Sequence, residues 1–576
     1  MEQSDFKFKN PLLEFVDDNS ELGFKVPDIS MFGMLKISEK SHPDALAYEY
    51  FGTKSSYKNA VCEIEKISGC YHALGVKKGD VVTIIMPNTP EAVLSIYALN
   101  RIGATANIVH PLSAQEEIKN YLNSVKSKVV LCIDLCYQKI VNIIDETSVK
   151  KVVFASAGDS MPLIMKTLYS LTSKNPKPSK NDSRYICWKA FRSYEKAVNE
   201  FSPEGAENDE PAIILHSGGT TGIPKDIQLS NRNFNAFGIQ AVLTLTDVSV
   251  GDKILAILPI FHGFGLGVCV HVAFCFGACS VLIPQFNAKK FVGIIKKYKP
   301  TMLFGVPTLY EALIKAKGTE KLDLSFLKYV VSGGDSLPSQ LENNVNEFLK
   351  KRNSSVKICE GYGMTEGLAA LSLSVGDSYN SGTIGKPLIG NKMCVVIPET
   401  TEVLPTNAEG ELCISGPTVM IGYRNNPSET ANTLKLHNDG KLWLHTGDLA
   451  LIDKDGFVHY KMRLKRMIIS SGFNVYPTQI ERVIEDIDFV EKCVVVAMPH
   501  HYKKEVPKAY IVLKDGKPKT DETIEEIRVF CKKKLAHHSV PYKYDFVDIL
   551  PKTPYNKIDF MKLQMESFKE AASQWN

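Results

Sequence analysis

Patterns typical of buried strands alternate with helical patterns in this chain, and that alternation restricts its fold more than any other feature. Strands are predicted at 80–86 (DVVTIIM), 128–133 (KVVLCI) and 150–156 (KKVVFAS), and helices at 57–76 and 90–104. The alternation resumes over 211–390. Strands separated by helices form mostly parallel sheets whose faces the helices cover. We therefore expect an α/β fold.

The chain has 576 residues, which is too many for one compact core. Short strands with turn signals follow residue 391 and predict a small antiparallel barrel or sheet. A charged run without glycine or proline, KMRLKR, occupies 461–466, and the sequence after it predicts a small α+β unit. The predicted domains are 1–460, with a barrel-like part at about 391–460, and 467–576, with the boundary at 461–466.

Charge and cysteine content narrow the class of protein. The 68 basic and 64 acidic residues give a net charge of only +4, whereas a dedicated nucleic-acid binder concentrates positive charge on one face. None of the 13 cysteines forms a CxxC pair, which is typical of free thiols in a reducing cytosol. The N-terminus lacks the apolar core of a secretory signal. We expect a cytoplasmic protein that does not bind nucleic acid.

Two stretches bear on contact with a membrane. Residues 263–283 approach the length of a spanning helix, but their glycines and β-branched residues favour a buried helix followed by a buried strand. Residues 158–197 interrupt the α/β pattern with an amphipathic stretch, MPLIMKTLYSL, and a lysine-rich loop. A surface insertion is the favoured interpretation, and a helix lying on a membrane surface is the alternative. Weak peripheral association with a membrane stays open.

The most informative local motif is ILHSGGTTGIPKDIQLS, residues 214–230. A P-loop needs glycine before its lysine and a hydroxyl residue after it, but Pro224 precedes Lys225 here and Asp226 follows it. This excludes a P-loop kinase or ATPase. The glycines still let backbone N–H groups turn inward, beside hydroxyl groups and a lysine. A phosphate-binding loop of another geometry is therefore predicted from Ser217, Gly218, Gly219, Thr220, Thr221, Gly222 and Lys225.

This loop resembles the signature loop of the adenylate-forming superfamily, which contains acyl-CoA synthetases, nonribosomal peptide adenylation domains and beetle luciferases. The resemblance extends from about residue 30 to about residue 563 through further motifs in the superfamily's order. They are LPIFHGFG (258–265), VSGGDSLP (331–338), GYGMTE (361–366), GELCISGPTVMIGYRNNPSET (410–430), WLHTGD (443–448), RLKRMIISSGFNVYPTQIE (463–481) and LPKTPYNKID (550–559). It implies a large N-terminal domain of two mostly parallel sheets with helices and a small β-barrel, and a mobile α+β C-terminal domain joined by a hinge.

The resemblance also implies a reaction. A carboxylate and ATP form an acyl-adenylate and pyrophosphate, and the acyl group then passes to a thiol, which makes CoA a co-substrate. The phosphate-binding loop would hold the β- and γ-phosphates, Glu366 would bind Mg²⁺, and Thr365 would contact the α-phosphate. Without the resemblance, a Thr-Glu pair could equally cap a helix.

For the nucleoside, the resemblance implies that Tyr362 stacks on adenine, with Gly334 and Asp335 at the edge of the base. Asp448 would accept hydrogen bonds from both ribose hydroxyls, and Arg463 would also contact the ribose. The alternatives are ordinary ones, because a lone tyrosine is common in a core and an aspartate after glycine is common in a turn.

For the acid, the resemblance places His262 beside the substrate carboxylate, and Lys557 between that carboxylate and the α-phosphate. A core histidine and a solvated lysine are the plain alternatives. The acyl pocket would be lined by Phe264, Val268, Gly333, Gly334, Gly363 and Ala370. Lys465 would be the hinge residue, and Ser470, Ser471 and Gly472 would lie on the path of the thiol.

Three positions depart from the superfamily pattern. Asp226 stands where glycine usually follows the loop lysine, and either points away from the phosphates or weakens ATP binding. Asn556 replaces the glycine before Lys557, and Gln479 replaces a common glutamate. None removes a group that the chemistry requires, so we expect a CoA ligase for a hydrophobic acid, fatty before aromatic. The alternatives are an aryl-CoA ligase, an acyl-AMP ligase that loads a carrier protein and, more remotely, a nonenzymatic acyl- or nucleotide-binding protein.

Overall fold

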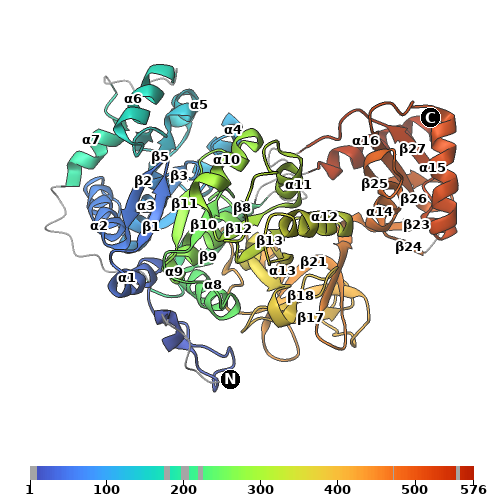
Figure 1. Ribbon diagram of the computed structural model, residues 1–576, viewed down its shortest axis with the longest axis horizontal. Helices are drawn as coiled ribbons and strands as arrows, with labels where there is room; N and C mark the ends of the chain where they lie inside the picture. The colour runs from blue at the N-terminus through green and yellow to red at the C-terminus, as the bar shows by residue number, and fades with distance from the viewer. Residues whose placement is uncertain are drawn as a thin grey trace. The chain divides into compact units, whose positions relative to one another are not determined.

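The computed structural model describes residues 10–173, 182–195, 207–217, 225–470, 473–552 and 558–575 (Figure 1). The chain separates into two compact units. The first comprises Met1–Met393, Ile414–Leu444 and Asp455–Val458, and the second comprises Cys394–Cys413, His445–Lys454 and His459–Asn576. The boundary expected at 461–466 stays a prediction.

One sheet of the first unit has the strand order β19-β9-β8-β4-β3-β5-β6-β7. Strands β8, β4, β3, β5, β6 and β7 run parallel, and β9 and β19 add antiparallel strands at one edge. The bounds are β3 Val81–Ile85, β4 Thr105–Ile108, β5 Val129–Ile133, β6 Lys151–Ala155, β7 Tyr185–Cys187, β8 Pro211–Ser217, β9 Lys225–Ser230 and β19 Gly422–Tyr423.

A second sheet has the order β16-β15-β14-β13-β12-β10-β11-β1-β2. Its six central strands are parallel, and β2, β15 and β16 are antiparallel at the edges. The bounds are β1 Leu46–Tyr50, β2 Thr53–Ser56, β10 Lys253–Ala256, β11 Cys279–Leu282, β12 Met302–Gly305, β13 Tyr329–Gly333, β14 Ile358–Gly363, β15 Ala370–Leu373 and β16 Lys386–Pro387. The prediction of two mostly parallel sheets is therefore confirmed.

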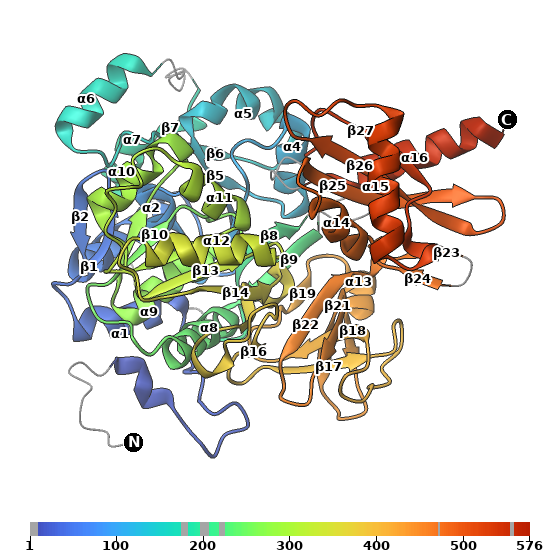
Figure 2. The ribbon, with the colours of Figure 1, turned by 45° about the vertical axis from the view of Figure 1, so that its right-hand side comes forward.

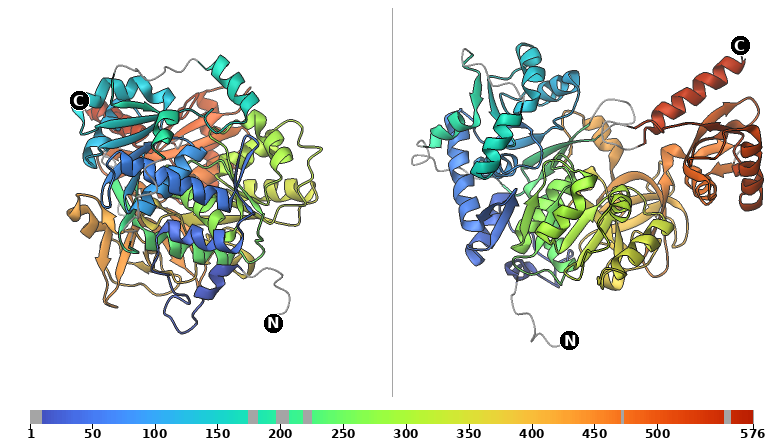
Figure 3. Two further views of the ribbon diagram at one scale, coloured as in Figure 1. Left: turned by 90° about the vertical axis from the view of Figure 1, so that its left-hand side faces the viewer. Right: turned by 45° about the horizontal axis from the view of Figure 1, so that its top comes forward.

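Helices accompany these sheets, as the alternation predicts (Figure 3). They include α1 Met31–Ser41, α2 Tyr57–Ala73, α3 Pro90–Ile102, α4 Gln115–Ser124, α5 Tyr137–Ile143, α8 Asn231–Thr244, α10 Ala288–Tyr298, α11 Pro307–Lys315 and α12 Ser339–Lys350. The sequence sets their ends: the hydroxyl of Thr89 caps the start of α3, and Gly103 ends it with a φ of 81°.

The apolar stretch 263–283 is interior structure. It forms a helix at Phe264–Val272, α9 at Ala273–Phe276 and the buried strand β11. The prediction of a buried helix followed by a buried strand is confirmed. In the part of the chain that the structure describes, no helix is long and apolar enough to cross a membrane.

The interruption at 158–197 contains α6 Leu163–Thr172 and α7 Trp188–Arg192. No residue of α6 is buried, which places this helix on the surface and fits both a surface insertion and a helix that lies on a membrane. By contrast, Trp188 and Phe191 of α7 are buried.

The small barrel expected at 391–460 is not a closed barrel within the described residues. Strands β17 Lys392–Val396, β18 Gly410–Ser415, β21 Leu442–Ile452 and β20 Leu434–Leu436 form an open sheet in the order β17-β18-β21-β20, and β22 Val458–Arg463 also pairs with β21. Closure would require the end strands to pair with each other. Strand β20 has only three residues, which pair with the start of β21 instead. The short helix α13 Pro427–Thr433 precedes β20.

The C-terminal part has the predicted α+β character. Its sheet has the order β24-β23-β26-β25, with β27 paired to β26. The bounds are β23 Ile468–Ser470, β24 Phe473–Val475, β25 Val490–His500, β26 Lys504–Leu513, β27 Lys543–Phe546, α14 Pro477–Glu485, α15 Asp521–Lys534 and α16 Phe560–Trp575.

Candidate nucleotide and acyl site

The predicted phosphate-binding loop joins the ends of two paired strands. Ser217 ends β8, Lys225 begins β9, and the two residues face each other in the antiparallel ladder. The hairpin thus fixes both ends of the loop. Its other predicted residues, Gly218, Gly219, Thr220, Thr221 and Gly222, lie outside the described residues, and their roles stay predictions.

Two residues that the sequence analysis did not single out surround the ammonium group of Lys225. Nζ contacts the carboxylate of Glu429 and lies 4.8 Å from the centre of the Tyr423 ring. The hydroxyl of Tyr423 donates a hydrogen bond of 3.0 Å to Oε1 of Glu366. The predicted phosphate lysine and the predicted Mg²⁺ ligand are therefore linked through one aromatic ring.

The link has a simple origin in the fold. Strand β19 adds to the edge of β9, so that Tyr423 pairs with Ile227, two residues after Lys225. Burial, followed by the charge of Glu366, raises the pKa of Tyr423 well above its ordinary value. Tyr423 therefore keeps its proton and acts as a donor to Glu366. Tyr423 and Glu429, which the sequence analysis did not single out, both lie in the motif at 410–430, and that motif was the available signal for them.

Asp226 lies away from the phosphate lysine. Successive residues of a strand point to opposite faces, so the side chains of Lys225 and Asp226 diverge. Oδ1 of Asp226 is 2.9 Å from Nδ1 of His216, whose Nε2 is 2.7 Å from Oδ1 of Asn107. Burial raises the pKa of Asp226, but the hydrogen bond and charge of His216 outweigh it and hold the pKa below the ordinary value. Of the two expectations for this departure, the structure supports a carboxylate that points away.

Glu366 and Thr365 lie in a short 3₁₀ turn, Thr365–Gly367, which Met364 separates from the end of β14. Glu366 is buried, and Leu368 after the turn has a φ of 73°, a backbone conformation that is strained for leucine. Gly363 has no room for a side chain, because a Cβ there would lie 1.5 Å from the carbonyl oxygen of Ala369. Tyr362 is buried in β14 opposite Ser372, and its role as adenine platform stays a prediction.

The structure brings several predicted acyl-pocket residues together. A Cβ at Gly333 would lie 3.3 Å from Cε1 of the Phe264 ring, and a Cβ at Gly363 would lie 3.0 Å from Cα of Ala370. Val268 is buried in the same helix as Phe264. Small residues therefore allow close packing around these positions.

Gly263 also has no room for a side chain, because a Cβ there would lie 1.5 Å from the carbonyl oxygen of Leu368. His262 is half-buried beside Phe261, with ring centres 5.0 Å apart. Gly334, with a φ of 77°, and Asp335 follow β13 on the surface. The substrate contacts of these residues stay predictions.

Two predicted ribose-binding residues contact each other in the second unit. Nε of Arg463 is 3.0 Å from Oδ1 of Asp448, and Nη1 of Arg463 donates to the carbonyl oxygen of Thr446 at 3.1 Å. The side chain of Asp448 is only 1% exposed, whereas that of Arg463 is 51% exposed. The pairing holds both groups in one place, and their binding to ribose stays a prediction.

The predicted hinge residue Lys465 is exposed in the turn Leu464–Arg466. The next residue, Arg466, forms an ion pair of 2.5 Å with Glu481. Ser470 is buried in β23. The remaining predicted residues, Ser471, Gly472 and Lys557, lie outside the described residues, as does the departure at Asn556, whereas Gln479 lies in α14.

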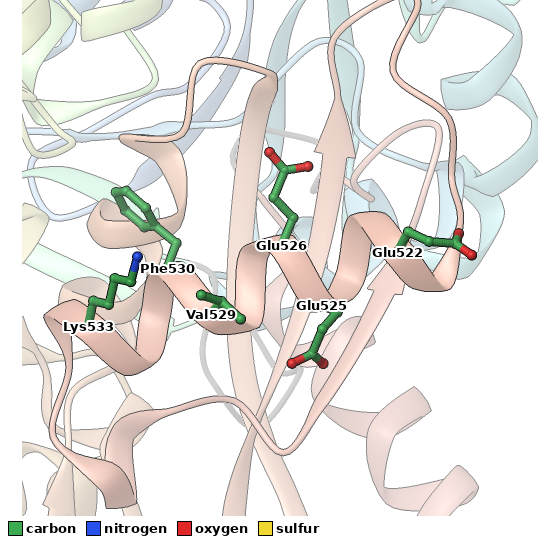
Figure 4. Close-up of a pocket in the computed structure, with 6 residues that line it drawn as sticks. All are labelled: Glu522, Glu525, Glu526, Val529, Phe530 and Lys533. Atoms are coloured by element: carbon green, nitrogen blue, oxygen red, sulfur yellow. The ribbon is translucent and has the colours of Figure 1, made fainter.

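A surface hollow along α15 contains none of the predicted residues. Figure 4 shows that all its lining residues come from that one helix: Glu522, Glu525, Glu526, Val529, Phe530 and Lys533. Two of its carboxylates are already paired, Glu525 with Arg528 and Glu526 with Lys517. An acidic hollow does not suit a triphosphate.

Comparisons with known proteins agree with the motifs. The model of the AMP-binding enzyme family matches residues 35–424, and that of the AMP-binding enzyme C-terminal domain matches residues 479–557. A long-chain-fatty-acid–CoA ligase of Bacillus subtilis is 30% identical over 541 residues, 92% of this chain and 94% of the relative. 4-Coumarate–CoA ligase 1 of Arabidopsis thaliana is 30% identical over 94% of this chain and 95% of the relative. The crystal structure of an ATP-bound RpMatB-BxBclM chimera matches with a TM-score of 0.82 and 25% identity, over 95% of this chain and 100% of that one.

Proposed function

Because this chain belongs to the AMP-binding enzyme family, we propose that it is an ATP-dependent, AMP-forming acid–CoA ligase for a medium- or long-chain fatty acid. In the first half-reaction a carboxylate oxygen attacks the α-phosphorus of ATP, and the bond to the bridging oxygen breaks to release pyrophosphate. In the second, the thiolate of CoA attacks the acyl carbon, and AMP leaves. The products are acyl-CoA, AMP and pyrophosphate.

The observation that best supports this proposal is the link from Lys225 through Tyr423 to Glu366. Phosphoryl chemistry depends on positioning and on neutralising negative charge rather than on acid–base groups. An ammonium group and a buried carboxylate joined by one tyrosine provide fixed points for phosphates and for a divalent cation.

Mg²⁺ is part of the proposal. In phosphoryl-transfer sites it is bound by one or two carboxylates together with phosphate oxygens. Glu366 fits this role, because it is buried and its Oε1 already accepts a hydrogen bond from Tyr423, which orients the carboxylate. Mg²⁺ there would neutralise phosphate charge during adenylation.

The other proposed roles divide by substrate. Thr365 contacts the α-phosphate, Tyr362 contacts adenine, and Asp448 and Arg463 contact the ribose. His262 contacts the substrate carboxylate. Lys557 offsets the charge that develops as the carboxylate meets the α-phosphate. Between the half-reactions, rotation of the backbone at Lys465 withdraws Lys557 and presents the CoA-binding face of the C-terminal domain instead.

The acid class rests on the small and apolar positions around Phe264, Gly333 and Ala370, which suit a hydrophobic chain. An aryl acid is the second candidate, because the Arabidopsis relative is a 4-coumarate–CoA ligase at the same 30% identity. A long-chain acid partitions into bilayers, so peripheral association with a membrane belongs to the same proposal.

The test is pyrophosphate release with saturated fatty acids of graded length and with hydroxycinnamic acids, each with and without CoA. We expect CoA-dependent turnover that is fastest with a fatty acid and is lost in Lys557→Ala. Preference for a hydroxycinnamic acid would replace the fatty substrate by the aryl one. Pyrophosphate release that CoA does not increase, and that leaves an enzyme-bound adenylate, would indicate carrier loading. No release with any acid would overturn the ligase assignment.

A further inference from the structure

Helix α6 carries an apolar stripe that the rest of the described chain does not cover. Ile164, Leu168 and Leu171 are 84%, 62% and 78% exposed. Their spacing of four and three residues places them on one face of the helix. Leu163, at the start of the helix, is 80% exposed. Isolated apolar residues on a surface are ordinary, but a contiguous apolar face on one helix marks an interaction surface.

The inner side of α6 is attached to the first unit. Tyr169 is the least exposed residue of the helix, and its ring lies against Gly158, where a Cβ would be 2.8 Å from Cδ1 of Tyr169. The turn before the helix is held by two hydrogen bonds, from Tyr50 Oη to the carbonyl oxygen of Ala157 at 2.7 Å and from Thr53 Oγ1 to that of Ser160 at 2.8 Å. A fixed base therefore presents the stripe outward, and Figure 2 shows α6 at the margin of the first unit.

The charge of this stretch favours a negatively charged partner. Residues 160–181 contain four lysines and no acidic residue. Lys166, on α6 itself, lies 3.7 Å from Asp159, and the other three lysines follow the helix in the sequence at 174, 177 and 180. Two copies of such a positive stretch would repel each other, whereas lysines beside an apolar helix complement anionic lipid headgroups.

We propose that α6 lies in the surface of an anionic membrane, with Ile164, Leu168, Leu171 and Leu163 inserted among the lipids. The proposed function enters this inference only as the purpose of the contact, which would be to collect an acid dissolved in the bilayer. The contact itself requires neither ATP nor CoA.

The test is sedimentation with vesicles, without substrates, using the full chain and the triple variant Ile164→Gln, Leu168→Gln, Leu171→Gln. The matched control replaces three exposed apolar residues elsewhere, Leu436→Gln, Leu442→Gln and Ile549→Gln, which are 65%, 57% and 81% exposed. Vesicles of phosphatidylcholine alone are compared with vesicles that also contain phosphatidylserine.

We expect the unmodified chain and the control to bind the phosphatidylserine vesicles, more weakly at high salt, and the α6 variant to bind about tenfold less or weaker still. Turnover of a short, water-soluble acid should be equal in all three proteins, which separates this proposal from the ligase assignment. Equal binding by the α6 variant, or no binding by the unmodified chain, would overturn the proposal. So would a dimer of the unmodified chain that the α6 variant loses, because a second copy would then cover the stripe.

Discussion

Replacing Glu429 by glutamine is expected to tighten ATP binding. The carboxylate of Glu429 contacts the ammonium group of Lys225, the group that we propose holds phosphate. ATP and Glu429 therefore compete for one cation. Glutamine keeps the size of the side chain and removes its charge.

The expected change in the Kd for ATP follows from how exposed the ion pair between Lys225 and Glu429 is. The side chains of Lys225 and Glu429 are 23% and 34% exposed, so their ion pair resembles the partly screened pairs that contribute about 0.5–1 kcal/mol. Releasing Lys225 from that pair should lower the Kd for ATP by about two- to fivefold. The gain should shrink as salt is added, because salt screens partly exposed charges.

The measurement is equilibrium binding of ATP by calorimetry, supported by the ATP dependence of pyrophosphate release. The matched control is Glu429→Asp, which keeps the charge and should stay near the unmodified protein. In a Lys225→Ala background, Glu429→Gln should have no effect on the Kd. An unchanged or weaker affinity in the single Glu429→Gln variant would refute the competition argument.

Three further predictions concern buried polar groups. Burial raises the pKa of Glu91 from 4.5 to about 7, so the fold loses stability between about pH 4.5 and 7, where this carboxyl is ionised in the unfolded chain but not in the folded one. The free energy of unfolding of Glu91→Gln should exceed that of the unmodified chain by up to about 3 kcal/mol at about pH 8, and the advantage should disappear near pH 4, as measured by urea unfolding. Because the pKa of Asp226 is lowered in the folded chain, its carboxylate stabilises the fold above the unfolded pKa of about 4, and this contribution is lost as the pH falls below it. Asp226→Asn should lower the free energy of unfolding by about 1–3 kcal/mol at neutral pH and change the KM for ATP less than about twofold. A large change in that KM would contradict a carboxylate that points away from the phosphates. Tyr423→Phe removes the hydrogen bond to Glu366, so the Mg²⁺ concentration for half-maximal pyrophosphate release should rise about tenfold; an unchanged Mg²⁺ dependence would show that Tyr423 does not orient that carboxylate.

Local patterns were sufficient to predict the α/β sheets. Buried parallel strands appear in a sequence as short apolar runs, and helices as spaced apolar positions with capping residues such as Thr89 and Gly103. The barrel was wrong because closure depends on which end strands pair. A set of short strands with turns is compatible with an open sheet or a closed one, and nothing local specifies how β17 or the three-residue β20 pairs.

For the candidate site, the motifs identified individual residues, whose substrate roles stay predictions, but not the contacts that join separate segments. Gly363 belongs to GYGMTE, whereas the carbonyl of Ala369, which leaves no room for a side chain there, lies three residues beyond that motif. Tyr423 and Glu429 lie about two hundred residues after Lys225 in the chain, and they reach it only because β19 pairs with β9. The direction of Asp226 likewise could not be assigned, since it depends on His216, which pairs with it across the sheet and is itself held by Asn107.

The pairing of β19 with β9 also bears on how a nucleotide would bind. Lys225 has Glu429 and the ring of Tyr423 as neighbours, and Glu366 has the hydroxyl of Tyr423. Although Lys225 and Glu429 are partly exposed, leaving either charge without a partner costs more than exchanging one partner for another. Phosphate arriving at Lys225 would replace one anion by another, and a cation arriving at Glu366 would meet a carboxylate that is already oriented. Binding energy would then be available for bringing two anions together, the step that adenylation requires.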